Sequence, residues 1–177
     1  MDVEWEDLQA AFLSTRTDKE YYLDRETGEV VSFNESDDDD EGDEAEGGED
    51  TGDGGDEVEE ALRLEFENDP DRFVEISPVA MPDLAEWMNA FILTVKVKDL
   101  AAKLPEAVNG HHPDRDFDRM LRKHPIERAR WIGFLETQVQ EIIAGWVEEN
   151  DVESETPPPW KPKAGRLRPP KKSTEPQ

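Results

Sequence analysis

Between Glu35 and Glu60 the chain carries 16 acidic residues and no lysine or arginine. Such a segment repels itself at neutral pH, and it has too little apolar surface to offset the entropy lost on ordering. It supplies over half of the net charge of −26. We therefore predict that residues 35–60 form a disordered acidic insert that divides the folding part of the chain in two.

The C-terminal segment, residues 151–177, has a different composition. It contains seven of the 13 prolines together with six basic residues. Runs such as Pro157-Pro158-Pro159 favour polyproline conformation and cannot continue a helix. We expect a disordered, Pro-rich basic tail. Residues 1–34 and 61–150 remain, about 124 residues, which is enough for a single domain with its own core.

The first part of this core predicts a short helix and a small sheet. Residues 7–13 have helical spacing, and residues 19–33 form two strand-like runs around Asp24-Arg25-Glu26-Thr27-Gly28. We expect Gly28 to adopt positive φ and Asp24 to accept a hydrogen bond from the turn backbone. A helix is predicted within residues 58–67, and alternation predicts a third strand at 72–76.

From Pro82 onward the apolar residues follow helical spacing. The sequence predicts about four helices, with Pro82 and Pro125 at helix starts and Gly110 at a helix end. The third is expected at residues 114–124 and the longest at 125–149. Its predicted apolar stripe comprises Ile132, Leu135, Val139, Ile142, Ile143 and Trp146. A small sheet followed by a helical cluster indicates the α+β class.

The absence of cysteine excludes disulfides, thiol nucleophiles and thiolate zinc sites. The acidic N-terminus lacks the features of a signal peptide, and no window approaches a membrane span, so we expect a cytoplasmic location.

Metal and catalytic sites have weak support. His111 and His112 lie beside Asp114 and Asp116, but adjacent histidines on a loop point in different directions and no distant ligand completes a set. We predict no metal and no cofactor. There is no glycine-rich phosphate loop or nucleophile elbow. No residue is therefore assigned a catalytic role, and the balance of features favours a non-enzyme.

One stretch departs from the acidity of the chain. Residues 114–130 contain six bases and four acids, a net charge of +2. This pattern is typical of a solvated helix face with local salt bridges, and the alternative is a contact surface for a phosphate group, RNA or an acidic protein. Trp160 lies among prolines, where it is either a bystander or an anchor on a partner or on the core. The candidate partner-binding residues are Arg115, Arg119, Arg122, Lys123, Arg128, Arg130 and Trp160.

The order and spacing of several short motifs resemble a known family. They include Tyr22-Leu23-Asp24 with Thr27-Gly28-Glu29-Val30, Ile76-Ser77-Pro78, Phe91-Ile92, Arg130-Trp131 and Trp146-Val147. The chain is similar over nearly the whole core to the bacterial group named uncharacterised protein family 0158. Where that family tends to have Gly-Lys-Gly-Ala-Phe-Arg, this chain has Gly-His-His-Pro-Asp-Arg at residues 110–115. The resemblance implies a bacterial source and no specific activity.

Three hypotheses of function follow. The first is a non-catalytic interaction or regulatory module that binds another protein. The second is a nucleic-acid-associated protein that uses the Arg115 to Arg130 face, and the third is an enzyme of unrecognised type. Halophilic origin is a further explanation of the acidity, because the core alone carries 26 acids against 14 bases. The sequence does not fix the oligomeric state.

Overall fold

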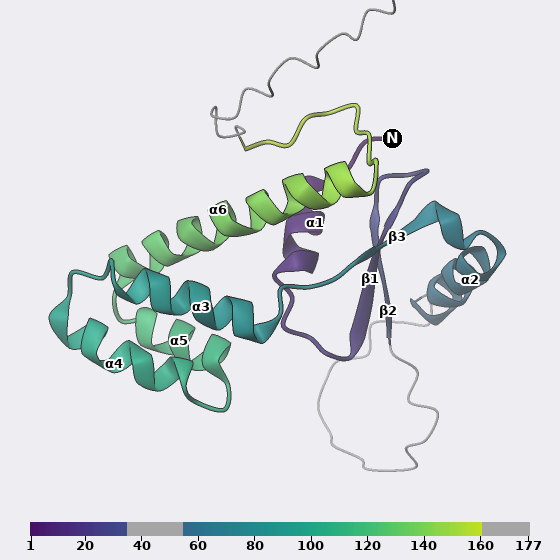
Figure 1. Cartoon of the computed structure of the whole chain (residues 1–177). Coiled ribbons are helices and arrows are strands. Elements are labelled where there is room, and N and C mark those ends of the chain that lie inside the picture. The colour runs from purple at the N-terminus through teal and green to yellow at the C-terminus, as the bar shows by residue number, and fades with distance from the viewer. Residues whose placement is uncertain (35–54, 161–177) are drawn as a thin grey trace, which may run out of the picture.

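A three-stranded antiparallel sheet lies beside an extended cluster of helices in the computed structural model (Figure 1). The structure describes residues 1–34 and 55–160, without the side chains of residues 55–57. Helix α1 (Trp5–Phe12) precedes strands β1 (Lys19–Asp24) and β2 (Val30–Asn34), and β3 (Phe73–Ile76) completes the sheet. The strand order is β2-β1-β3. The predicted α+β class is confirmed.

The hairpin between β1 and β2 forms as its turn residues predict. Gly28 has a φ of 86°, and the Glu26 amide donates to the Asp24 carboxylate at 2.8 Å. The Gly28 amide donates to the Asp24 carbonyl at 2.8 Å, which closes the turn. Both sequence-based expectations for this turn are therefore confirmed.

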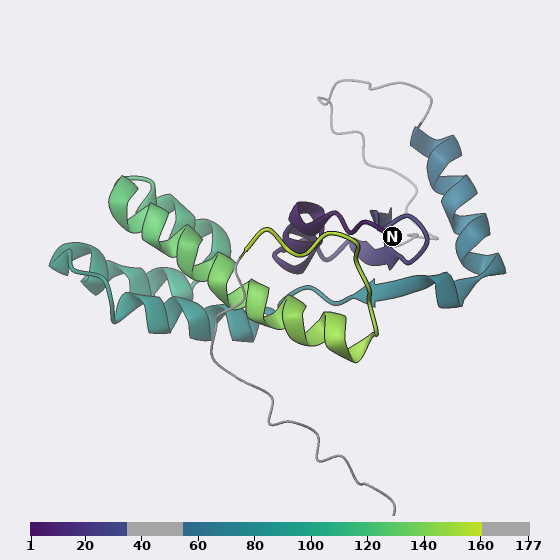
Figure 2. The ribbon, with the colours of Figure 1, turned by 90° about the horizontal axis from the view of Figure 1, so that it is seen from above.

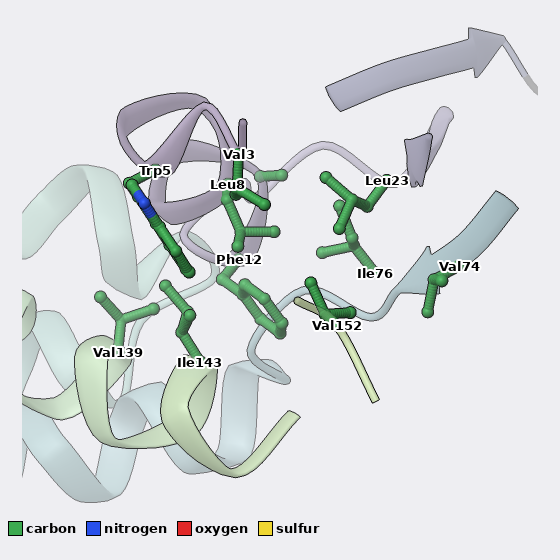
Figure 3. Packing of buried hydrophobic residues seen from close by; sticks show 11 residues of the cluster. Val3, Trp5, Leu8, Phe12, Leu23, Val74, Ile76, Val139, Ile143 and Val152 are labelled. Atoms are coloured by element: carbon green, nitrogen blue, oxygen red, sulfur yellow. The ribbon is translucent and has the colours of Figure 1, made fainter. Parts of the chain in front are cut away.

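The sheet has a buried layer on each face because side chains alternate along its strands. Leu23, Val74 and Ile76 pack on one face against α1 and the C-terminal half of the last helix, as Figure 3 shows. On the other face Val31, Phe33 and Phe73 pack with Tyr22 and with Leu62 and Phe66 of helix α2 (Gly55–Asn68). Helix α2 begins within the predicted insert, which therefore ends earlier than expected; the rest of that insert lies outside the described residues.

Four further helices form the second half of the molecule: α3 (Met81–Ile92), α4 (Lys98–Val108), α5 (Pro113–Leu121) and α6 (Pro125–Glu149). Their core includes Phe91, Leu104, Phe117 and Trp131. Helix α6 crosses from this core to the sheet-side core, since Trp131 lies in the first and Val139 and Ile143 lie in the second. Figure 2 shows α6 running along the length of the molecule. It is the element that connects the two halves.

The predicted apolar stripe of α6 was wrong at two positions. Ile132 is 42% exposed and Ile142 is 37% exposed, whereas Trp131 is buried. The buried face of α6 is set by two different partners, the helical core at its N-terminal half and α1 with the sheet at its C-terminal half. A single periodic stripe does not describe such a helix.

The ends of α4 and α5 also differ from expectation. Helix α5 stops at Leu121 rather than at residue 124, because a residue before proline disfavours helical backbone and His124 precedes Pro125. His124 instead precedes the first turn of α6. Gly110 follows the end of α4 but does not have the positive φ of a glycine helix cap.

The chain after α6 does not leave the fold at residue 151. Asp151 has a φ of 50°, and the Val152 amide donates to the Val147 carbonyl at 3.0 Å, which is the pattern of a Schellman cap. Residues 152–160, here called the strap, then run back along the N-terminal segment. Val152 is buried in the sheet-side core. The predicted boundary at residue 150 was therefore about ten residues too early; the tail from residue 161 lies outside the described part.

Candidate functional site

The strap fixes the position of Trp160. The Val3 amide donates to the Ser154 hydroxyl at 3.1 Å, and the Trp5 indole donates to the Thr156 carbonyl at 3.1 Å. Trp160 packs edge-to-face on Trp5, with ring centroids 5.7 Å apart. Of the two sequence-based interpretations of Trp160, the structure shows an anchor, and the surface it contacts belongs to the same chain.

The predicted basic residues lie on α5, on α6 and on the residues between them. Four of the arginines form local ion pairs: Arg119 with Asp116 at 3.0 Å, Arg122 with Asp118 at 2.8 Å, Arg128 with Asp118 at 3.0 Å and Arg130 with Glu127 at 2.5 Å. These arginines are engaged within the chain, as the salt-bridge interpretation of the pattern expects. Arg115 and Lys123 are exposed and form no ion pair within residues 1–34 and 58–160.

Asp118 links α5 to α6 by accepting hydrogen bonds from Arg122 and Arg128. Partial burial acts to raise the pKa of Asp118, but the two guanidinium groups outweigh it and lower that pKa below its usual value. The carboxylate therefore stays ionised at neutral pH, and it holds these two arginines in place.

Arg130 has a different structural role. Its guanidinium donates to the carbonyl and to the hydroxyl of Thr94, both at 3.1 Å, and lies 5.6 Å from the centre of the Phe91 ring. It thereby fixes the segment between α3 and α4 against α6. The start of α6, the end of α3 and the start of α4 meet at the end of the helical cluster opposite the sheet, on the left of Figure 1. We call this surface the helical end.

Apolar side chains are exposed at the helical end. Leu93 is 89% exposed, Ile126 is 79% exposed and Val97 is 38% exposed. Val97 and Ile126 line one hollow of about 260 Å³ together with Lys123, His124, Pro125 and Glu127. Leu93 precedes Thr94 in sequence, and Thr94 accepts a hydrogen bond from Arg130. Arg130 lies one turn of α6 after Ile126. The three apolar side chains thus come from segments that meet at the helical end.

A second hollow adjoins the first. It has a volume of about 340 Å³, and it lies between α4 and α5. Its apolar lining is Leu100 and Met120, and its cationic lining is Lys103, Arg119 and Lys123; Asp99 and His124 complete it. Lys123 and His124 contribute to both hollows.

Sequence reasoning named Arg119 and Lys123 at this surface but missed Leu93, Ile126, Lys103 and Met120 as surface features. One signal was available. Leu93 directly follows α3, and Ile126 lies in the first turn of α6. Both lie off the predicted apolar stripes, so neither is expected in the core. Lys103 gave no signal, because its relation to Lys123 depends on how α4 packs on α5.

The structure does not gather metal ligands from the parts of the chain that it describes. His111 and His112 are exposed at the start of α5, and no group of three or more His, Asp or Glu residues in residues 1–34 and 58–160 could hold a metal ion. In the same described residues, none of the helices has the length and apolarity needed to cross a membrane.

The arrangement of elements can now be compared with known proteins. The profile of the uncharacterised protein family UPF0158 matches residues 1–162. The chain belongs to this family. The family match includes the hairpin, all six helices that the structure describes and the strap up to Trp160.

A relative in the UPF0158 family is the UPF0158 protein PA5073 of Pseudomonas aeruginosa. The two sequences are 27% identical over 104 residues, which cover 54% of this chain and 68% of the relative. No solved structure matches the chain. Membership in UPF0158 confirms the resemblance seen in the sequence and assigns no activity.

Proposed function

We propose that this protein is an interaction module that binds an acidic, amphipathic segment of another protein at the helical end. The observation that carries this proposal is the exposure of Leu93, Val97 and Ile126 on one surface beside a hollow rimmed by lysine and arginine. Exposed apolar side chains that cluster are typical of binding surfaces, whereas those scattered singly are not.

Charge complementarity supports an acidic partner. Residues 93–130 contain nine basic and six acidic side chains, a net charge of +3 in a chain whose net charge is −26. A partner segment with carboxylates beside its apolar residues gains attraction here, and the rest of the protein repels it. Among the surfaces formed by residues 1–34 and 58–160, the helical end is therefore well suited to an acidic partner.

Nucleic acid is the weaker alternative for the same basic residues. Arg119, Arg122 and Arg128 are ion-paired to carboxylates of their own chain. A nucleic-acid phosphate at Arg122 or Arg128 would have to compete with Asp118, and the overall negative charge opposes a polyanion. Apolar side chains such as Ile126 gain little from a phosphate backbone. These features favour a protein partner.

The proposal is tested by affinity capture from a lysate of the source organism at physiological salt. Leu93→Asp and Ile126→Asp place a carboxylate on the apolar surface. Leu64→Asp is the matched control, because Leu64 is 55% exposed on α2, away from the helical end. We expect one identified protein to be captured by the native chain and by the control, and lost with both helical-end variants.

The contact itself is mapped by cross-linking. The chain has no cysteine, so Val97→Cys provides a single attachment point for a photo-reactive group. Cross-links to an acidic segment with interspersed apolar residues would support the proposal. Equal capture by all variants would overturn it, as would cross-links to a basic segment. Capture of RNA in place of protein, lost on Lys123→Gln, would establish the nucleic-acid alternative instead.

A further inference from the structure

The hollow between α4 and α5 has the size and lining of a small-molecule site. Its volume of about 340 Å³ lies in the range of pockets that hold ligands of one or two rings. Leu100, which is 4% exposed, and Met120 provide an apolar lining from facing helices. A methionine thioether adapts its shape to a ring and makes favourable contacts with aromatic groups.

Three cations surround this apolar lining from three separate positions. Lys103 comes from α4, Arg119 from α5 and Lys123 from the segment between α5 and α6. Within residues 1–34 and 58–160, Lys103 and Lys123 form no ion pair. Arg119 uses one nitrogen for Asp116 and is 73% exposed, so its other N–H groups can reach an anion.

Asp99 is the one acidic residue of this lining. Its three cationic side chains and one carboxylate, counted without His124, give a formal net charge of +2. That charge suits one anionic group. A ligand with several phosphates would meet the repulsion of Asp99 and of the strongly acidic remainder of the chain.

We propose that this hollow binds a small amphipathic anion: an apolar body about the size of one aromatic ring that bears a single phosphate or carboxylate. The ring contacts Leu100 and Met120, and the anionic group accepts hydrogen bonds from Lys103, Arg119 and Lys123. This site is separate from the apolar surface proposed for the protein partner, although Lys123 and His124 line both hollows. It does not depend on the existence of that partner.

The test uses phenyl phosphate and benzoate as probes, with inorganic phosphate and benzyl alcohol as the charged and apolar halves alone. Each is titrated into the full chain, and amide chemical shifts are followed by NMR. For a ligand of this size we expect a Kd on the order of 0.1 to 1 mM. Binding of phenyl phosphate or benzoate should be about tenfold tighter than that of either half.

Variants assign the binding to the hollow. Lys103→Gln and Lys123→Gln should each weaken phenyl phosphate binding by about fivefold, whereas Lys19→Gln on β1 makes the same charge change away from the hollow and should leave it unchanged. Shifts should concentrate in residues 99–103 and 119–124. The proposal is overturned if inorganic phosphate binds as tightly as phenyl phosphate, or if the shifts lie elsewhere.

The two proposals fail separately. Ile126→Asp removes part of the apolar surface, but Ile126 does not line this hollow. It should abolish capture of the protein partner and leave phenyl phosphate binding within about twofold. If the native chain captures the protein partner but does not bind phenyl phosphate or benzoate, the small-molecule site alone is refuted.

Discussion

Replacement of Gly28 is expected to destabilise the fold through two effects that the structure separates. The first is backbone strain, because Gly28 has a φ of 86° and a residue with a Cβ atom is strained there. The second is a collision. A Cβ atom at residue 28 would lie 2.6 Å from the carbonyl carbon of Asp2 and closer still to its oxygen. The N-terminal segment crosses directly over the turn.

The expected cost of Gly28→Ala follows from these contacts. Strain contributes about 1 to 2 kcal/mol. Displacing the N-terminal segment also breaks the hydrogen bond from the Glu4 amide to the Gly28 carbonyl, which is 3.1 Å long and contributes about 1 kcal/mol. It also exposes part of Val3, at about 1 kcal/mol or more. The free energy of unfolding should therefore fall by about 3 to 4 kcal/mol.

Urea denaturation followed by tryptophan fluorescence measures this change. With an m-value of about 2 kcal/mol/M, the midpoint should fall by roughly 1.5 to 2 M. Gly145→Ala is the control, because no atom lies within 4 Å of a Cβ atom there and α6 gains about 0.5 to 1 kcal/mol from alanine. A fall of less than about 0.5 kcal/mol for Gly28→Ala would refute the reasoning.

A second substitution distinguishes strain from collision. Asparagine tolerates positive φ better than alanine but carries the same Cβ atom. If collision with Asp2 dominates, Gly28→Asn should cost nearly as much as Gly28→Ala. If the asparagine variant is close to the native protein, the N-terminal segment moves aside without cost and strain alone explains the alanine result.

Three further predictions concern other contacts of the fold. Asp24→Asn should cost about 2 to 3 kcal/mol at pH 7, because the buried carboxylate accepts a hydrogen bond from Arg72 Nε at 2.7 Å. Burial acts to raise the pKa of Asp24, but Arg72 and the Glu26 amide lower it overall, so this stability is present above about pH 4 and is lost as the pH falls through the lowered pKa. The urea midpoints of the two proteins should approach each other as the pH falls below about 4, and a gap that stays constant with pH would contradict this. Trp160→Ala should lower the free energy of unfolding by about 1 kcal/mol and alter Trp5 fluorescence; an unchanged urea midpoint would mean that the end of the strap adds no stability. Asp151→Gly should raise the melting temperature, by the equivalent of about 0.5 to 1 kcal/mol, because its φ of 50° favours glycine; a lower melting temperature would contradict the cap assignment.

The features that sequence reasoning predicted correctly depend on local signals. The hairpin turn is specified by Asp24 and Gly28, which are four residues apart and determine their own conformation. The bounds of α6 agree with prediction because Pro125 begins it. In each case the residues that decide the structure lie within one turn or one helix.

The features that were missed depend on contacts between distant parts of the chain. Val152 and Trp160 are isolated apolar residues in a polar, Pro-rich segment. Val152 joins the sheet-side core, and Trp160 packs on Trp5, which is about 150 residues away in sequence. The exposure of Ile132 depends on which neighbour covers each half of α6. Composition described this segment correctly as poor in apolar residues, but two well-placed side chains and hydrogen bonds with Met1, Val3 and Trp5 are enough to hold it.

The candidate site illustrates the same division. Sequence reasoning identified a basic stretch, and four of its arginines form ion pairs within the chain, as the salt-bridge interpretation expected. Of the cations proposed for the ligand, Arg119 has such a pair, whereas Lys103 and Lys123 have none within residues 1–34 and 58–160. Lys103 joins Lys123 only through the packing of α4 on α5. A count of charges along the chain cannot distinguish a paired arginine from an available lysine.

The architecture also separates the two signs of charge in space. In the sheet half, residues 58–68 of α2 carry four glutamates and one arginine. Within residues 1–34 and 58–160, the excess of basic residues lies toward the helical end, and α6 spans the distance between the two halves, about 37 Å for 25 residues. Such a separation exceeds the Debye length at physiological salt, so the glutamates of α2 weaken the attraction of the helical end for an anion only slightly. An acidic partner is then repelled by one half and attracted by the other, and this orients its approach toward Leu93, Val97 and Ile126.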